Sequence, residues 1–309
     1  AVGPAITYNK PVTPTKFSVT PAMVVPEPTG MTPTVDTMEI TKSEGYEFGW
    51  TGEEQLAIRG SFGASTVTAS AFAEALALLT DEFEQDLGIE AIANGSRAVG
   101  TAGTTPFGSN FDEIADIRKI LDDNGAPKDM RSLVINTNAA ANLRKLSQLT
   151  KVNEAGTSMT LRQGELLDIH GFSIKESAAR GAHTKGTGAG YLVNGTLAVG
   201  ATTIPADVGT GTILAGDVVT FAGDTNKYMV VEALAAGSFK IGGPGLRVAP
   251  ADNAAITVGN NYTGSVAFTQ RSIHLITRAP AIPTEGDAAV DSFLLTDPRS
   301  GLTFEVRVY

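Results

Sequence analysis

Three histidines are the side chains best suited to acid–base or metal chemistry in this sequence, and they lie far apart along the chain. They are His170, His183 and His274. None belongs to an H-E-x-x-H pattern or to a group of acids that would complete a metal site. We therefore expect each to be a structural histidine rather than a metal ligand. The chain also has no cysteine, which excludes disulfides, thiolate nucleophiles and Cys-ligated zinc.

Adjacent carboxylates are the next candidates for chemistry. Asp122-Asp123 and Glu53-Glu54 are interpreted as solvated helix ends rather than as general acid/base pairs. No G-x-S-x-G elbow anchors a Ser-His-Asp hydrolase. The Gly/Thr-rich loop at residues 95–109 lacks the G-x-x-x-x-G-K-[ST] order of a phosphate-binding loop. The sequence thus predicts no catalytic, metal-binding or cofactor-binding residue, and no cofactor.

The charge balance limits the partners. The net charge is −10 over 309 residues, and no basic run is present that would bind a phosphate backbone. A negative container around nucleic acid stays compatible with this charge, because like charges keep the polymer off the wall. No stretch reaches the roughly 20 apolar residues of a membrane helix. Residues 1–25 lack the basic start and apolar core of a signal peptide.

One long amphipathic helix dominates the predicted secondary structure. An apolar stripe recurs at helical spacing and predicts a helix over residues 68–94, with the stripe facing a core: Phe72, Leu76, Leu79, Phe83 and Leu87. This length is more than twice the usual 11 or 12 residues or so. Asn94-Gly95 is expected to form a left-handed C-cap. Gly88 costs about 1 kcal/mol relative to Ala and could bend or stop the helix.

The segment before this helix reads as extended. Residues 1–16 contain three prolines and are expected to form an extended arm or a disordered tail. Residues 17–25 and 34–50 read as two extended segments around a Pro/Gly turn, which would form a hairpin, followed by a short helix after Trp50. A ribbon of this kind is not stable alone in water, so we expect it to lie on a neighbouring subunit.

The middle of the chain reads as a small α/β layer. Asn110 is expected to cap a helix that Gly125 stops. Residues 131–135 form a short apolar strand, and a second helix follows, capped by Asn136, Thr137 or Asn138. Residues 167–177 are expected to form two short strands about a turn at Gly171.

The last third reads as mainly β. Residues 186–190 (GTGAG) are expected to be a flexible hinge. Short β-type runs then alternate with Gly/Asp/Asn turns up to about Tyr262, which is typical of a small antiparallel barrel or sandwich. Residues 266–280 read as one long strand. A terminal hairpin turns at residues 297–301, and its last strand alternates between apolar and polar residues.

The order of these elements resembles the major capsid proteins of tailed bacteriophages, whose fold is called the Johnson or HK-ninety-seven fold. Residues 133–143 (LVINTNAAANL) are similar to a strand-then-helix segment of that family. Residues 161–166 (LRQGEL) with 169–177 (IHGFSIKES) resemble a recurring passage of it. Three more segments resemble the branch with P-twenty-two-type coat proteins: residues 215–221 with 228–231, 266–268, and 297–309. The resemblance spans the chain, but its motifs are loose and none is catalytic.

The resemblance implies an α+β capsid fold with the following parts: an N-terminal arm (1–16), an extended β-hairpin loop (17–60), a peripheral domain (61–125) with a spine helix at 68–94, an axial domain (126–184), an inserted small β-barrel domain (185–262), and a return strand with a terminal hairpin (263–309). Family members usually carry a longer segment before the hairpin. A start at Ala1 would then reflect proteolytic maturation, removal of Met or a late start.

The implied function is structural, not enzymatic. Copies of the chain would assemble as hexamers and pentamers into an icosahedral shell that encloses double-stranded DNA without sequence-specific binding and without a membrane. The implied further partners are a scaffolding protein, a portal and a decoration or cement protein. The implied location is the virion, with assembly in the cytoplasm of a bacterial host. Two alternatives stay open: an encapsulin-like shell around protein cargo, and a secreted β-rich adhesin or carbohydrate-active enzyme.

Overall fold

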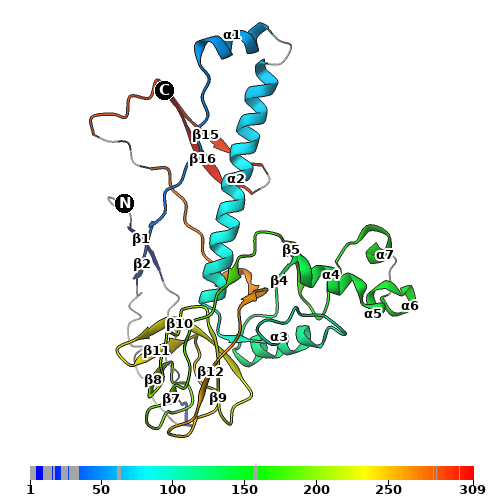
Figure 1. The fold of residues 1–309 in the computed structure, drawn as a ribbon, viewed down its shortest axis with the longest axis vertical. Coiled ribbons are helices and arrows are strands. Elements are labelled where there is room, and N and C mark those ends of the chain that lie inside the picture. Colours follow the sequence, from blue (N-terminus) through cyan, green and yellow to red (C-terminus); the bar gives the residue numbers. More distant parts are fainter. Residues whose placement is uncertain are drawn as a thin grey trace. The chain divides into compact units, whose positions relative to one another are not determined.

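The computed structural model describes residues 5–9, 16, 18–21, 27, 35–60, 64–155, 159–166, 168–280, 282, 284–298 and 300–309. The chain is α+β and divides into two compact units (Figure 1). Unit 1 comprises Ala1–Leu79 and Leu275–Tyr309, and unit 2 comprises Thr80–His274. Among the described residues, no helix is long and apolar enough to cross a membrane.

Unit 2 contains the predicted α/β layer. Its strands are β4 (Arg131–Asn136), β5 (Ser173–Ser177) and β14 (Val266–Thr269), in the order β14-β4-β5. β5 runs parallel to β4, and β14 runs antiparallel to it. The helices of this part are α3 (Asp112–Asp123), α4 (Thr137–Lys145), α5 (Ser147–Thr150), α6 (Val152–Ala155) and α7 (Met159–Gln163). The last four lie between β4 and β5, as a parallel connection requires.

A continuous apolar core joins α3, α4, β4 and β5. Its fully buried members include Phe107, Ile114, Leu133, Leu143 and Phe172. One prediction for this layer is partly confirmed. Of the two strands expected about Gly171, the second is present as β5 and pairs with β4, whereas the first reduces to a single bridge between Ile169 and Phe172.

The predicted helix ends of this layer are largely confirmed. The Oδ1 atom of Asn136 accepts a hydrogen bond of 2.7 Å from the N–H of Ala139, which is an N-cap. Gly125 has φ +73°, and the N–H of Ala126 donates to the carbonyl of Leu121 at the end of α3. The expected cap at Asn110 is wrong by one residue: the N-cap of α3 is Phe111, which has no capping side chain.

The β part of unit 2 is a closed antiparallel sheet. Its strands are β7 (Leu192–Val193), β8 (Thr203–Asp207), β9 (Val218–Phe221), β10 (Lys227–Ala235), β11 (Ser238–Ile241) and β12 (Ile256–Val258). The order is β12-β9-β10-β11-β8-β7, and a bridge between Leu192 and Ala255 returns β7 to β12. The sheet thus comes close to a barrel, in agreement with the predicted small antiparallel barrel or sandwich, and it surrounds a second core that includes the fully buried Tyr228 and Phe239. One of the short β-type runs read from the sequence, residues 196–200 (TLAVG), forms no strand.

A strand from outside the predicted insertion joins this sheet. β3 (Arg97–Ala98) follows the long helix and pairs with β10. The sequence does not predict β3, since two residues within a Gly/Thr-rich loop carry no periodic signal. The barrel is therefore not a simple insertion at residues 185–262, because a segment from far upstream completes its sheet.

Two further expectations for unit 2 are wrong. The predicted flexible hinge at residues 186–190 is hydrogen-bonded: Gly186 is buried, and the N–H of Gly188 donates to the carbonyl of Thr212 at 2.7 Å. A Cβ at Gly186 would lie 2.2 Å from that carbonyl oxygen, so the glycine permits a close approach rather than flexibility. The predicted long strand at 266–280 ends with β14 at Thr269, and a 3-10 helix (Gln270–Ser272) follows.

The long helix is confirmed as α2 (Ala64–Ala93), which contains 30 residues and extends from one unit into the other. Gly88 does not stop the helix. A Cβ at Gly88 would lie 2.8 Å from Nη1 of Arg180, so this residue lets the guanidinium rest on the helix. The apolar stripe is only half-buried at all five positions. The left-handed cap is wrong, since Gly95 has no positive φ and instead approaches Met229.

Unit 1 consists of small elements. They are β1 (Ala5–Asn9), β2 (Val35–Glu39), α1 (Gly52–Gly60), the N-terminal part of α2, β15 (Asp291–Thr296) and β16 (Thr303–Val308). β2 is expected to pair with residues 17–25. It pairs instead with β1, with Ala5 opposite Glu39. The described residues of that range, 18–21, form no strand, and the others lie outside the described residues. The expected short helix after Trp50 is confirmed as α1.

The terminal hairpin is confirmed. β15 and β16 pair in register from Asp291–Val308 to Thr296–Thr303. The Oδ2 atom of Asp297 accepts hydrogen bonds from the backbone N–H and the hydroxyl of Ser300, and Gly301 has φ +71°. The register puts Phe293, Leu295, Phe304 and Val306 on one face, as the alternation in the sequence predicts.

Replacing a residue at the centre of the α/β core should destabilise unit 2 alone. We expect Phe172→Ala to lower the free energy of unfolding by about 3–5 kcal/mol, because it leaves a cavity among fully buried side chains. Urea unfolding followed by far-UV circular dichroism measures this. Val199→Ala, at a 63% exposed position of the same unit, is the control and should change stability by less than about 0.5 kcal/mol.

Candidate functional site

The chain enters and leaves the barrel through a short, polar joint. β6 (Ala182–His183) pairs with β13 (Tyr262–Thr263) at this point. The Nε2 atom of His183 lies 2.8 Å from Oδ1 of Asp217, whose side chain is fully buried. The ring of Tyr262 lies 5.3 Å from that of His183, and its hydroxyl donates to the carbonyl of Gly216 at 2.6 Å.

Asp217 organises this joint. Its carboxylate accepts hydrogen bonds from the backbone N–H groups of Gly186 and Leu214 in addition to the contact with His183. A buried carboxylate needs such donors, since an unsatisfied one is costly. Burial, with the nearby Asp217 charge, raises the pKa of Tyr262, which keeps the hydroxyl protonated as a donor. These are the contacts of a structural histidine, as the sequence predicts for His183.

A second joint connects the barrel to α3. The Nη2 atom of Arg247 donates to Oδ1 of Asn124 at 2.6 Å and to the carbonyl of Asp123 at 2.9 Å. Arg97, from β3, contacts the Asp123 carboxylate at 3.4 Å and the side chain of Asn226 at 3.2 Å. Both arginines meet the C-terminal end of α3, where the helix dipole favours positive charge.

The paired acids Asp122 and Asp123 are exposed at the end of α3, as predicted, and each also has a basic partner. Asp122 accepts from the buried Arg131 at 2.8 Å, and this hydrogen bond lowers the pKa of Asp122. Burial raises the pKa of Asp123, but contacts with Lys119 and Arg97 outweigh it and the pKa falls below the ordinary value.

The other pair, Glu53-Glu54, stands at a helix start, as expected. Glu54 accepts from the backbone N–H of Thr51 at 2.8 Å, and the Thr51 hydroxyl accepts from the N–H of Glu54 at 3.4 Å. This reciprocal pair is a capping box at the start of α1. The hydrogen bond from the Thr51 N–H lowers the pKa of Glu54.

The three histidines are not brought together. His170 has φ +51° before the Gly171 turn, and its carbonyl accepts from Arg118. His183 lies in the joint of the barrel, and His274 follows the 3-10 helix at the end of unit 2. Within the described ranges, no group of three or more His, Asp or Glu side chains could hold a metal ion.

The feature with the clearest functional meaning is the uncovered apolar surface of unit 1. Every buried hydrophobic residue of the described chain lies between Phe107 and Ile256, in unit 2. Of the described residues of unit 1, none is buried. Large apolar side chains of unit 1 are exposed instead: Val35 65%, Leu56 68%, Val290 84%, Leu294 67% and Tyr309 74%. The sequence indicates that the ribbon needs a support, but it does not predict that all described residues of this unit are left unburied.

Aromatic side chains of unit 1 contact one another. Phe48 meets Trp50 at 5.6 Å and Phe72 of α2 at 5.0 Å between ring centroids. Phe72 also meets Phe293 of β15 at 6.5 Å. These rings connect the loop, the helix and the hairpin in one row, and each ring still has an open side, because none of the four side chains is buried.

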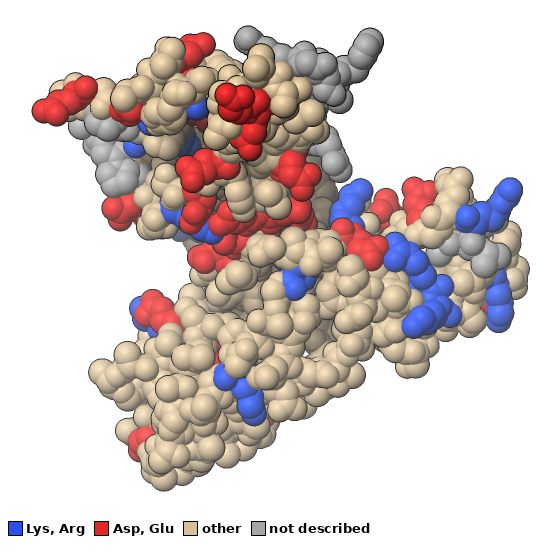
Figure 2. Space-filling view, turned by 45° about the horizontal axis from the view of Figure 1, so that its top comes forward, with Lys and Arg blue, Asp and Glu red and all other residues tan. Residues whose placement is uncertain are grey.

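The charged residues of unit 2 are unevenly distributed. Figure 2 shows Lys and Arg gathered on the lobe formed by α4 to α7, which carries Arg144, Lys145, Lys151 and Arg162. Two of these are paired: Arg144 with Glu176 at 2.6 Å and Lys151 with Glu154 at 3.1 Å. The barrel surface in the same view is mostly uncharged. In this view, the described residues form no broad basic track of the kind that follows a nucleic-acid backbone.

Comparisons with known proteins gave structural similarity only. No family model and no curated sequence matches the chain. A structure from Mycobacterium phage Che8 aligns with 19% identity and a TM-score of 0.44, covering 86% of this chain and 84% of that one. The mature capsid of bacteriophage PhiM1 aligns with 12% identity and a TM-score of 0.40, covering 88% and 83%. The capsid of cyanophage P-SCSP1u aligns with 13% identity and a TM-score of 0.44, covering 86% and 83%.

Removing the buried charge at the joint should loosen the barrel's attachment. In Asp217→Asn, an amide N–H₂ faces backbone N–H donors, so we expect the free energy of unfolding to fall by about 1–3 kcal/mol. Amide exchange at Gly186 and Leu214 should accelerate at least tenfold. Asp252→Asn is the matched control, since that exposed aspartate accepts a single backbone N–H, from Gly195. Unchanged exchange in Asp217→Asn would contradict the assigned role.

Lowering the pH should reduce the stability of unit 2, because Asp122 becomes protonated. Its pKa is lowered in the folded state, so its stabilising contribution is present above the ordinary value of 3.8 and is lost as the pH falls through the lowered value. We expect Asp122→Asn to flatten the dependence of the urea midpoint on pH below about pH 4. Asp116→Asn, at an exposed position of the same helix, should leave that dependence intact.

Proposed function

We propose that this chain is a major capsid protein of a tailed bacteriophage, whose copies assemble into the icosahedral shell that encloses the double-stranded DNA genome. The observation that carries the proposal is that none of the described residues of unit 1 is buried, whereas unit 2 contains two buried cores. A polypeptide that leaves its hairpins and a helix face uncovered gains its missing burial from other molecules. The order of elements read from the sequence indicates which molecules cover this surface, namely further copies of the same chain.

The energetics favour association through unit 1. Two-stranded ribbons such as β1–β2 and β15–β16 are marginal when alone in water. Covering an exposed Val or Leu contributes up to about 1.5–3 kcal/mol, so several such residues suffice for a stable contact. A closed shell repeats each contact many times, and modest interfaces then give a stable particle.

In the proposed shell, the parts have mechanical roles. Residues 17–60 reach over a neighbouring subunit, with the ribbon formed by β1 and β2 rather than by residues 17–50 alone. The peripheral domain (61–125) contains α2 as its spine, the axial domain (126–184) surrounds the five- and six-fold axes of the pentamers and hexamers, and the barrel faces outward as the inserted domain of the P-twenty-two-type branch. Residues 263–309 return to the peripheral domain.

The proposed partners and location follow from this role. The scaffolding protein, portal and decoration protein would bind the shell, and assembly would take place in the host cytoplasm before the protein becomes part of the virion. The net charge of −10 suits a container for DNA, because the wall does not adsorb the polymer. The protein acts as a structural element and performs no catalysis.

Electron microscopy with one pair of variants tests the proposal. The purified protein, alone or with a scaffolding protein, should form closed shells or flat hexamer arrays in negative stain. Leu294→Asp should abolish these assemblies and leave unit 2 folded by circular dichroism, because Leu294 is 67% exposed in the single chain. Val199→Asp, similarly exposed on the barrel, is the control and should still assemble.

Two outcomes would contradict the proposal. A stable monomer at high concentration, with no assembly beside a scaffolding protein, would remove the shell function. Shells isolated from cells with protein cargo and no DNA would instead support an encapsulin-like compartment.

A further inference from the structure

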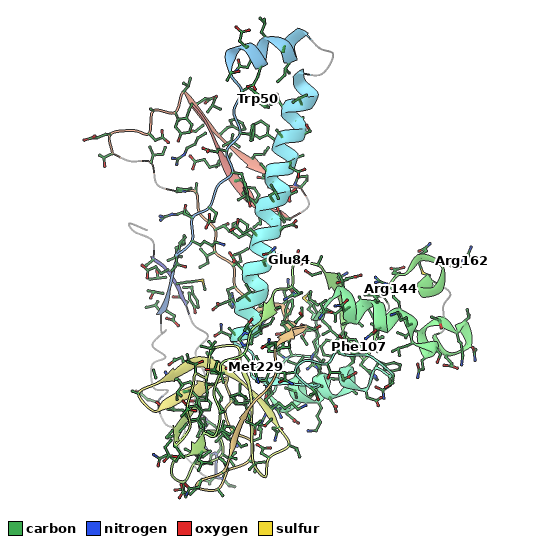
Figure 3. The ribbon with its side chains drawn as sticks, viewed as in Figure 1. Trp50, Glu84, Phe107, Arg144, Arg162 and Met229 are labelled. Carbon is green, nitrogen blue, oxygen red and sulfur yellow. The ribbon has the colours of Figure 1, made fainter. Side chains whose placement is uncertain are left out.

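Four aromatic rings form an open row in unit 1, called here the aromatic row. In order they are Trp50, Phe48, Phe72 and Phe293, with successive ring centroids 5.6, 5.0 and 6.5 Å apart. Trp50, labelled in Figure 3, lies where the chain leads into α1. Neighbouring rings are inclined by 57–86° rather than stacked, and Phe48 is 39% and Phe293 42% exposed. The row therefore offers open slots between its rings to a flat, apolar group.

Aromatic-lined grooves are a common binding surface for proline-rich segments. In the polyproline II conformation, a P-x-x-P segment repeats every three residues, or about 9 Å, and presents its prolines on one side. This repeat is close to two ring-to-ring steps of the aromatic row. Such a segment is extended before it binds, so little conformational entropy is lost when its pyrrolidine rings enter the grooves.

The chain contains P-x-x-P twice, at residues 11–14 (PVTP) and 280–283 (PAIP). In the second, the carbonyl of Pro280 accepts a hydrogen bond of 3.1 Å from Nη2 of Arg307, which attaches it to the hairpin of its own chain. The first belongs to residues 10–16 (KPVTPTK), which follow β1 and are called here the proline segment. The proline segment is therefore the better candidate for the aromatic row of another molecule.

The charges of the proline segment complement those beside the aromatic row. Lys10 and Lys16 flank its prolines, and Lys16, its described residue, is exposed. Exposed carboxylates stand before and after the rings of the loop in sequence: Glu44, Glu47 and Glu53. Two copies with a net charge of −10 each repel one another on average, so a basic segment that meets these acids supplies attraction and selects this contact.

The register of the β1–β2 ribbon indicates which molecule supplies the segment. Ala5 lies opposite Glu39 at one end of the ribbon, and Asn9 lies at the other end. The chain after Asn9, which is the proline segment, therefore leaves the ribbon at one end. The chain after Glu39, which continues to Phe48, leaves it at the opposite end. This arrangement favours a second copy, rather than the same chain, as the source of the segment that binds the row.

We propose that the aromatic row of unit 1 binds the proline segment of a second copy of this chain. The segment lies on the rings as a polyproline II helix, with Pro11 and Pro14 in the slots and its two lysines beside the acids. The inference rests on the proposed function, because it names one contact through which copies in a shell cover the apolar surface of unit 1.

A synthetic peptide tests the contact, with Trp50 as the probe, because it is the only tryptophan of the chain. The receptor is the full-length, unassembled Pro11→Ala/Pro14→Ala protein, whose own segments do not compete. The end-blocked peptide KPVTPTK should shift the Trp50 emission to shorter wavelength in a saturable way. The peptide KAVTATK has the same charges without proline and should bind at least tenfold more weakly.

Substitutions in the receptor locate the bound peptide. Phe48→Leu and Phe293→Leu keep an apolar side chain but remove the ring, and each should weaken binding at least fivefold. Tyr309→Leu is the matched control, since this residue is 74% exposed, belongs to the same unit and lies outside the row. It should leave the affinity unchanged. Glu44→Gln with Glu47→Gln should weaken binding about twofold to fivefold, as is usual for exposed charges.

Photo-crosslinking identifies the chain that supplies the segment. Chains labelled with ¹⁵N and carrying benzoylphenylalanine in place of Thr13 are mixed with unlabelled wild-type chains at a concentration that permits association. Mass spectrometry should find the labelled segment joined to unlabelled peptides that contain Phe48 or Phe293. Cross-links to labelled rows alone would show binding within one chain and would overturn the inference.

The inference is also overturned by a peptide that leaves the Trp50 emission unchanged, by KAVTATK binding as tightly as KPVTPTK, or by Tyr309→Leu weakening binding as much as Phe48→Leu. Shell assembly is scored separately in negative stain. Wild-type shells without peptide binding would overturn this inference alone. Peptide binding by a protein that never forms shells would overturn the proposed function and leave the contact standing.

Discussion

Apolar surface is buried very unequally in this chain, and the other features of the fold follow from that imbalance. Unit 2 closes two hydrophobic cores on its own, whereas the described part of unit 1 buries no residue at all. Hydrophobic burial is the largest favourable contribution to folding, and it offsets the conformational entropy that the chain loses. Unit 2 therefore buries enough apolar surface to fold by itself, whereas unit 1 requires further contacts to be stable.

Polar joints connect the barrel to the rest of unit 2. Asp217 holds His183 and two backbone N–H groups on one side, and Arg97 with Arg247 reaches the end of α3 on the other. Hydrogen bonds and ion pairs require a defined geometry, whereas apolar contacts tolerate displacement. These joints therefore fix how the barrel attaches to the α/β layer, although the two cores have no residue in common.

Several sequence features that could indicate a catalytic or binding site have structural roles in this protein. Adjacent acids, isolated histidines and glycine-rich stretches could each mark a site. In this fold Asp122 pairs with Arg131, Glu54 completes a capping box, and Gly186 admits the Thr212 carbonyl. Each of these structural roles depends on a residue remote in sequence or on local backbone geometry. Residue types alone therefore do not distinguish a catalytic or binding residue from a structural one.

Elements whose signal is local can be predicted from the residues alone. The stripe on α2, the Asn136 cap, the turn at residues 297–301 and the short strands of the barrel follow from periodicity, capping and turn chemistry, which act over a few residues. The pairings between distant segments emerge only in the folded chain. β3 joins β10, β1 rather than residues 17–25 pairs with β2, and β5 lies parallel to β4. The residues of a two-residue strand or an apolar run do not indicate which strand it pairs with. Strand pairing depends on which surfaces remain to be buried after the local elements have formed.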